Sequence, residues 1–415
     1  MAQEQKPGAE SVTPGAKPMA GGAAIVRRPP GPRLRKVKTR TLGMVLSGGG
    51  ARGAFQVGVY ERLLRDPRFA SGPTVLAGTS AGAINSALIA AGKSPREMMQ
   101  FWNGIADNPP VVASAKFFRT AVASLLRVTL DEGAAWVRSG RPLRAFLQRA
   151  WNHLPPQPGG FLALWVEYVL TKRFHLISHF LEGVAEPFLA DTSELRERLI
   201  DTFGGEEVPS NGIRLAINTV DAHTGHVVRY ANAETPLTRP PDYVIVDAIT
   251  VDMVLASASI PLLFPPVKIG PHLLWDGGLL VNTPLAPVVA LGADEIVTVL
   301  VTEPPDADRG PFKQFGRAVE RTVDSFLENA YNTDRKLLLE RNRLARLEKS
   351  GYREVKLYEA VRPARDGVFD AGSYLYFERK VLADMHTAGR RAAQAWLAAG
   401  PRVDHLEEHG AVVAA

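Results

Sequence analysis

The pattern of hydrophobic and polar positions becomes regular at residue 42. Residues 42–46 are an apolar run closed by glycines, and residues 53–65 carry apolar side chains at helical spacing. A second apolar run at 74–77 also ends in glycines and is followed by a segment of small residues at 83–91. Strand, glycine turn and helix repeated in this way predict an α/β fold with a parallel sheet.

The same alternation returns beyond residue 210. Segments 213–220 and 227–231 flank a turn at 221–225 and predict a hairpin. An apolar run at 256–266 and a short strand that ends in Asp276 follow. The remaining elements expected are helices at 243–255, 284–291, 313–348 and 374–398, and strands at 295–301 and 354–360.

Residues 95–195 differ in character from both flanking regions. Thirteen of the 32 aromatic residues lie between Phe101 and Phe188, including four of the six tryptophans. We interpret this segment as a helical, aromatic-rich insertion that serves as a pocket, a lid, a membrane-contacting face or plain core. Helices are expected near 95–106, 113–130, 133–152 and 161–183.

The formal charge of +6 belongs to the N-terminal tail. Residues 1–40 hold nine basic and two acidic residues, whereas the other 375 residues hold 40 basic and 41 acidic ones. The tail is rich in Pro and Gly without apolar periodicity, which predicts disorder. The balanced body argues against a nucleic-acid partner. The tail fits an anionic membrane tether, a secretion address, a partner site or a passive leader.

These shifts in composition predict four regions. They are a disordered basic tail at 1–40, a main domain at 41–302 that includes the insertion, a C-terminal helical extension with one strand at 303–400, and a polar tail at 401–415. Neither a Sec signal peptide nor a transmembrane helix is expected, because no apolar segment has the required place or length. We therefore expect a cytoplasmic or peripheral membrane protein, with non-Sec secretion left open.

The first motif that carries chemistry is GGGARG, from Gly48 to Gly53. Consecutive glycines let the backbone approach a ligand and turn successive N–H groups toward it. The loop therefore suits either oxyanion stabilisation or phosphate binding. It also matches the G-x-G-x-x-G dinucleotide fingerprint, but the acid that should end the next strand is missing.

The second and third motifs are GTSAG, with Ser80 between Gly78 and Gly82, and DGG, with Asp276 before Gly277 and Gly278. A G-x-S-x-G elbow exposes a serine at a helix N-terminus, where the helix dipole favours developing negative charge. An aspartate that ends a strand can accept the proton of such a serine. Taken alone, GTSAG is also compatible with a tight turn, and DGG is a common turn.

Other catalytic groups find little support in the sequence. The chain has no cysteine, which excludes a thiolate nucleophile and a cysteine zinc site. A base that follows the serine and aspartate in chain order would be His386, His405 or His409, and none has the sequence context of a residue facing the elbow. No histidine pair has a third ligand nearby, so neither a metal nor a cofactor is expected.

In this order, GGGARG, GTSAG, ASASIPLLFPP and DGG resemble the patatin-like phospholipase family, over roughly residues 42–302. The resemblance implies a three-layer α/β/α fold and a catalytic dyad of Ser80 and Asp276 without histidine. It also implies an oxyanion hole formed by the backbone N–H groups of Gly48, Gly49 and Gly50. The aspartate that often precedes the glycine run is here Ser47.

The activity implied is that of a lipid acyl hydrolase, of phospholipase A or lysophospholipase type, acting through an acyl-enzyme on Ser80. The substrate would be a phospholipid or another acyl-ester lipid. Arg52 would orient the loop, contact a substrate phosphate or form a structural salt bridge. Two alternatives stay open: a dinucleotide-binding oxidoreductase using Gly48–Gly53, and a catalytically silent membrane-associated scaffold.

Overall fold

The computed structural model describes residues 40–108, 115–138, 175–234, 242–304, 315–347, 351–364, 369 and 371–405. The expected disorder of residues 1–39 and the helices expected within 139–174 lie outside these ranges, as does the end of the chain from residue 406. Within the described ranges, no helix combines the length and apolar character needed to cross a bilayer.

One mixed sheet organises the described part of the chain. Its main path runs β5-β4-β3-β2-β1-β8-β9, and β7 pairs with both β3 and β6. The strands β3, β2, β1, β8 and β9 run parallel, whereas β4 and β7 run antiparallel to β3. The strands are β1 Leu42–Leu46, β2 Val75–Gly78, β3 Arg214–Asp221, β4 Val227–Ala231, β5 Tyr243–Ile245, β6 Val267–Ile269, β7 His272–Asp276, β8 Glu295–Val299 and β9 Lys356–Leu357.

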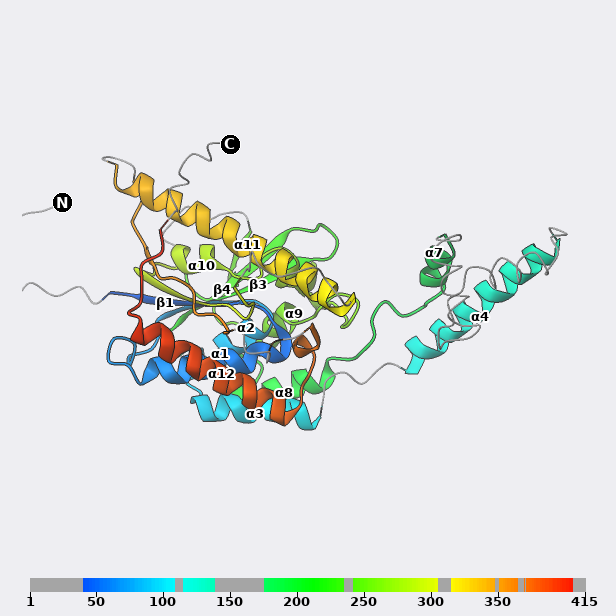
Figure 1. Cartoon of the computed structure of the whole chain (residues 1–415), viewed down its shortest axis with the longest axis horizontal. Coiled ribbons are helices and arrows are strands. Elements are labelled where there is room, and N and C mark those ends of the chain that lie inside the picture. The colour runs from blue at the N-terminus through cyan, green and yellow to red at the C-terminus, as the bar shows by residue number, and fades with distance from the viewer. Residues whose placement is uncertain are drawn as a thin grey trace, which may run out of the picture. The chain divides into compact units, whose positions relative to one another are not determined.

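Helices cover both faces of this sheet (Figure 1). Met44 and Leu46 of β1 join one core cluster and Val45 joins the other, because successive side chains of a strand point to opposite faces. The first cluster includes α1, α2, α3, α8, α9 and α12, and the second includes α10 and α11. The α/β fold class with three layers is therefore confirmed. The helices are α1 Gly53–Leu64, α2 Ala81–Ala90, α3 Pro95–Asp107, α4 Ala115–Arg138, α7 His175–Glu182, α8 Ser193–Phe203, α9 Val251–Ser257, α10 Leu285–Ala290, α11 Phe315–Ala345 and α12 Arg379–Ala398.

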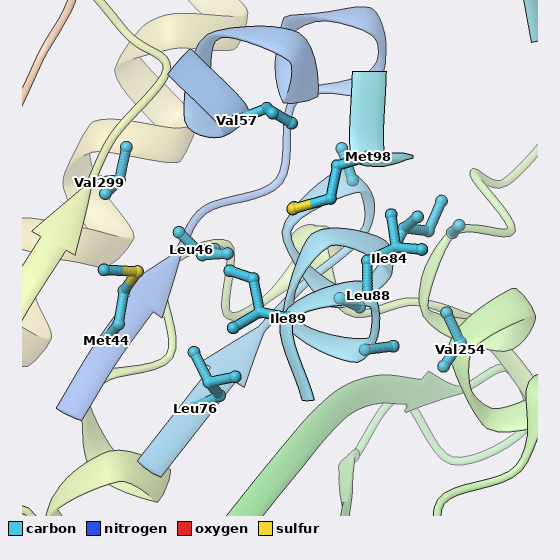
Figure 2. Packing of buried hydrophobic residues seen from close by; sticks show 14 of the residues in the cluster. Met44, Leu46, Val57, Leu76, Ile84, Leu88, Ile89, Met98, Val254 and Val299 are labelled. Atoms are coloured by element: carbon cyan, nitrogen blue, oxygen red, sulfur yellow. The ribbon is translucent and has the colours of Figure 1, made fainter. Parts of the chain in front are cut away.

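The helix α2 lies in the centre of the first core cluster. All of its residues are buried, which its many alanines permit by leaving room for close packing. Figure 2 shows Ile84, Leu88 and Ile89 of α2 among the aliphatic side chains of β1, β2 and α3. The helix that follows the GTSAG motif is thus held rigidly on every side.

The elements nearest the motifs confirm the sequence predictions, but the helix predicted at 243–255 is wrong. Residues Tyr243–Ile245 form β5 and pair with β4, because aromatic and β-branched side chains suit a strand. The helix α9 begins only after Thr250, whose hydroxyl accepts a hydrogen bond from the Met253 N–H at 3.3 Å and caps the helix.

The predictions for the insertion and the C-terminal region also need correction. The break expected near 131–132 is absent, and α4 continues to Arg138 and packs on α7, where the Ser124 hydroxyl donates to the Phe180 carbonyl. The strand expected at 354–360 is only two residues long. The last helix begins at Arg379, after the 3-10 helix η3 at Ala371–Tyr374. Asp404, placed by sequence in a polar tail, is buried and paired with Arg335.

Candidate active site

Two strands, β2 and β7, meet end to end along one edge of β3, which brings the GTSAG and DGG motifs together. The last residue of β2, Gly78, pairs with Ile217, and the last residue of β7, Asp276, pairs with Thr219. Since β4 occupies the opposite edge of β3, β2 and β7 lie on the same edge. Their carboxyl ends are therefore two residues apart along β3, or about 7 Å. The register of the sheet places the elbow beside Asp276.

The elbow holds Ser80 in a strained backbone conformation. Ser80 has φ 55° and ψ −126° immediately before α2, a combination that costs ~1–3 kcal/mol and is concentrated at functional sites. The flanking glycines are required by close approach. A Cβ on Gly78 would overlap the Gly82 carbonyl oxygen, and a Cβ on Gly82 would overlap the Leu46 carbonyl oxygen. The Ser80 side chain thus sits at the N-terminus of a buried helix.

The Asp276 carboxyl is poised to exchange a proton near neutral pH. Burial raises the pKa of Asp276 to about 7, although hydrogen bonds from the Gly278 N–H and the Ser80 side chain act to lower it. The Gly278 N–H lies 2.7 Å from Asp276 Oδ1, and Asp276 is only 5% exposed. A carboxyl of this pKa in contact with a hydroxyl can serve as a general base.

Two polar residues that the sequence analysis did not single out position the elbow. The Ser80 N–H donates to Ser257 Oγ at 3.1 Å, and the Ser257 hydroxyl donates to the Asn218 carbonyl oxygen at 2.6 Å. The Asn218 side-chain amide in turn donates to Thr79 Oγ1. Ser257 lies in the ASASIPLLFPP run, where a small polar residue inside an apolar segment was the available signal.

The glycine loop presents fewer free N–H groups than the sequence suggested. The Gly48 N–H donates to the Asn282 carbonyl oxygen at 3.1 Å, so it is not available to a ligand. The N–H groups of Gly49 and Gly50 have no hydrogen-bond partner among the described residues. Gly50 also lines the same cavity as Ser80 and Ala81. The loop therefore offers two candidate oxyanion donors in place of three.

The residues around the loop have structural roles. Arg52 is buried, and its guanidinium donates to Ser373 Oγ at 2.8 Å and to the Val301 carbonyl at 3.1 Å, which favours the structural role among those expected. Gly53 packs on the indole of Trp102. At Ser47, the hydroxyl accepts a hydrogen bond from the Val301 N–H.

The DGG glycines also serve close packing and hydrogen bonding. A Cβ on Gly277 would lie 2.5 Å from the Asn218 carbonyl oxygen. Gly278 contributes the N–H that holds Asp276 Oδ1. Both glycines thus fix the aspartate at the end of β7.

Two histidines in the described ranges, His386 and His272, pair with carboxylates other than Asp276. His386 Nε2 lies 2.8 Å from Glu61 between α12 and α1, and burial lowers the pKa of His386. His272 pairs with Asp221 at 2.6 Å. In the part of the chain that the structure describes, no three His, Cys, Asp or Glu side chains are grouped so that they could hold a metal ion.

An apolar cavity opens directly beside Ser80. It has about 440 Å³ of empty space, part of it open to solvent. Apart from Ser80, its walls are backbone and apolar or aromatic side chains from α2, α3, α8 and the segment after α9, together with Leu375 and Phe377. Such a cavity suits the hydrocarbon part of a ligand whose polar group lies at Ser80.

For the ester hydrolysis that the sequence resemblance implies, we expect Gly50→Ala to lower kcat by ~10²-fold, the cost of losing one oxyanion donor. Gly50 has φ 55°, and a Cβ there would overlap the Tyr374 carbonyl oxygen, so the loop must shift. Gly270→Ala is the matched control, because Gly270 has φ 56° and open space around the position of a Cβ. Both variants should lose stability, measured by thermal unfolding. Equal activity in the two variants would contradict this role of the loop.

Comparisons with known proteins agree with the motifs. The family model described as patatin-like phospholipase matches residues 44–289, which confirms the resemblance. No curated protein sequence matches the chain. The matched family leaves no support for the dinucleotide-binding alternative.

Solved structures of three proteins are similar to the chain at low identity. VipD from Legionella pneumophila is 15% identical (TM-score 0.36; 88% of this chain, 68% of that one). The type III effector ExoU from Pseudomonas aeruginosa is 17% identical (TM-score 0.35; 87% and 53%). Human GIVD cytosolic phospholipase A2 is 11% identical (TM-score 0.36; 87% and 57%). The chain thus spans 53% to 68% of their lengths. TM-scores this low do not establish a shared fold, and the family assignment rests on the match of residues 44–289 to the family model.

Proposed function

Because the chain belongs to the patatin-like phospholipase family, a family of lipid hydrolases, we propose that it cleaves carboxylic ester bonds of acyl lipids through an acyl-enzyme on Ser80. The reaction is of phospholipase A or lysophospholipase type. One observation carries the proposal. The carboxyl of Asp276, with its pKa raised to about 7, contacts the Ser80 side chain beside an apolar cavity.

In the first step Ser80 Oγ forms a bond to the carbonyl carbon of the ester, and its proton passes to the Asp276 carboxylate. The carbonyl oxygen gains negative charge, which the free N–H groups of Gly49 and Gly50 and the N-terminus of α2 stabilise. The bond to the leaving alcohol then breaks. Asp276 returns the proton to that alcohol, which leaves the acyl group on Ser80.

In the second step a water molecule attacks the acyl carbonyl carbon and gives its proton to Asp276. The bond between Ser80 Oγ and the acyl carbon breaks, and the proton returns to Oγ as the fatty acid leaves. Asp276 thus acts as base and then as acid in each half of the reaction. A pKa near neutral suits both tasks, whereas a carboxyl at its ordinary pKa would be a weak base.

We expect kcat/KM to rise about tenfold per pH unit below pH 7 and to level off above it, since only ionised Asp276 accepts the Ser80 proton. The measurement is a pH profile of a soluble aryl ester over pH 5–9, which reports the free enzyme. An unchanged rate from pH 7 down to pH 5 would contradict Asp276 as the base.

The proposed function is tested with a panel of phospholipids, lysophospholipids and aryl esters, with product analysis by mass spectrometry. Free fatty acid and the matching alcohol or lysolipid are expected, and addition of a calcium chelator should leave the rate unchanged. Release of no fatty acid from any member of the panel would favour the silent scaffold instead. Strict calcium dependence would contradict the mechanism.

A further inference from the structure

The chain beyond the matched family region reaches back to the glycine loop. The family match ends at residue 289, but η3 at Ala371–Tyr374 packs on the 3-10 helix η1 at Gly50–Arg52. The contact is so close that a Cβ on Gly50 would overlap the Tyr374 carbonyl oxygen. A C-terminal segment therefore packs against Gly50, the residue whose N–H group is proposed to bind the oxyanion.

Arg52 fixes this segment to the loop through several interactions. Its guanidinium lies 3.6 Å from the centre of the Tyr374 ring and donates to Ser373 Oγ at 2.8 Å. Asp324 of α11 lies 3.8 Å from the guanidinium and accepts a hydrogen bond from the Tyr374 hydroxyl at 2.7 Å. Because the Arg52 side chain is 1% exposed, these contacts are made away from water, where a planar guanidinium is favoured over an ammonium.

The residues that follow η3 form part of the cavity wall. Leu375 and Phe377 line the cavity beside Ser80, whereas Tyr376 between them does not. The Phe377 ring stacks on Trp102 of α3, with ring centres 6.4 Å apart and planes 8° apart. Leu375 is 49% exposed, so it stands where the cavity opens to solvent.

We propose that residues 371–377 form the wall that selects the acyl chain, and that Arg52 is the positioning residue that holds this wall on the glycine loop. Stacking on Trp102 fixes the ring of Phe377. The size of the Leu375 side chain therefore determines how wide the cavity is where it opens to solvent. The ligand is an unbranched hydrocarbon chain that ends in a carbonyl or carboxyl group. The effect on hydrolysis rests on the proposed function, whereas the effect on binding of the hydrocarbon ligand does not.

The test compares p-nitrophenyl butyrate with p-nitrophenyl decanoate as the ratio of their kcat/KM values. We expect Leu375→Ala to shift this ratio roughly fivefold or more toward decanoate, and Leu375→Trp to shift it by a similar factor toward butyrate. Tyr376→Ala is the matched control, because Tyr376 is 52% exposed and adjacent. The ratio does not depend on the fraction of folded enzyme. An unchanged ratio in both Leu375 variants overturns the proposal.

Binding of sodium decanoate and sodium butyrate by calorimetry separates this inference from the proposed function. If Ser80→Ala leaves hydrolysis intact, the proposed mechanism fails, yet Leu375→Ala and Leu375→Trp should still change decanoate affinity in opposite directions. If neither variant changes the affinity, the wall does not select the chain, whatever the nucleophile is. Either result is decisive for the inference alone.

The role of Arg52 is tested with Arg52→Lys, which keeps the charge but loses the planar contacts. We expect the chain-length ratio to shift as in Leu375→Ala, together with a fall in kcat, because the wall and the loop are released together. Arg379→Lys is the matched control, since Arg379 pairs with Asp107 on the exposed surface. A loss of thermal stability in Arg52→Lys with an unchanged ratio would reduce Arg52 to a structural residue.

Discussion

Replacing Ser80 with alanine lowers kcat for every ester by at least ~10³-fold, because the covalent route through Oγ is lost while binding and the oxyanion donors remain. The backbone of the elbow is held by the Ser257 hydroxyl and by α2, not by the Ser80 side chain, so the variant should fold normally. The measurement is hydrolysis of a soluble aryl ester, with circular dichroism and thermal unfolding as the check on folding.

Ser86→Ala provides the matched control for this variant. Ser86 lies on the same helix and is fully buried, and its hydroxyl has no hydrogen-bond partner among the described residues. Ser86→Ala should therefore keep its activity. In addition, Ser80→Gly should unfold at a higher temperature than Ser80→Ala, because glycine adopts φ 55° without strain. Ester hydrolysis that persists in Ser80→Ala would remove Ser80 from the mechanism.

Replacing Asp276 with asparagine has two opposite effects, a loss of ester hydrolysis of ~10³-fold or more and a gain in stability at high pH. Asparagine cannot take up the Ser80 proton, but its side-chain oxygen can still accept the hydrogen bond from the Gly278 N–H. In the folded protein Asp276 keeps its proton up to about pH 7, against 3.8 for the ordinary carboxyl. Wild type therefore loses stability as pH rises through this window, whereas the variant has no proton to lose.

The stability gap should be small at pH 4, grow up to about pH 7 and stay constant above it. At pH 9 we expect Asp276→Asn to be more stable by about 4 kcal/mol, because the pKa of Asp276 is raised from 3.8 to about 7 and each pKa unit corresponds to ~1.4 kcal/mol. The measurement is urea unfolding of both proteins at several pH values. A variant that is less stable than wild type at pH 9 would contradict the raised pKa of Asp276.

Asp221→Asn is the control of opposite sign. The hydrogen bond with His272, together with the N–H groups of Thr224 and His223, lowers the pKa of Asp221 to about 2 against the effect of burial. The charged form thus contributes stability that is present above pH 3.8 and lost as pH falls toward 2. Asp221→Asn should be less stable than wild type at neutral pH, and should keep its esterase activity.

The local parts of the site were predictable from sequence because each motif specifies its own backbone. Only glycine fits at positions 78 and 82, because a Cβ at either position would overlap a backbone carbonyl oxygen. An apolar run before each motif marks a strand. The α/β class with a parallel sheet followed from the same alternation of strands and helices, and the three layers followed from the family resemblance. The close approach at Gly78 is to Gly82 in the same motif, which a sequence displays directly, whereas the one at Gly82 is to Leu46 of β1.

The parts that were not predictable depend on register and on distant contacts. Asp276 meets Ser80 only because β2 and β7 end two positions apart on β3, and no local pattern records that register. The hydrogen bond from the Gly48 N–H to the Asn282 carbonyl oxygen joins residues 234 positions apart. For the same reason the contact of Tyr374 with Gly50 has no signal in the sequence around either residue.

The central claim, that Ser80 is the nucleophile activated by Asp276, is tested most directly by covalent labelling with an alkyl fluorophosphonate. Trypsin should release Ser80 within a peptide that spans Phe69–Lys93, which also contains Ser86. We expect fragmentation of this peptide to place the label on Ser80, and we expect labelling to slow strongly in Asp276→Asn. A label on another residue, or an unlabelled Ser80 in protein that still hydrolyses esters, would contradict the account.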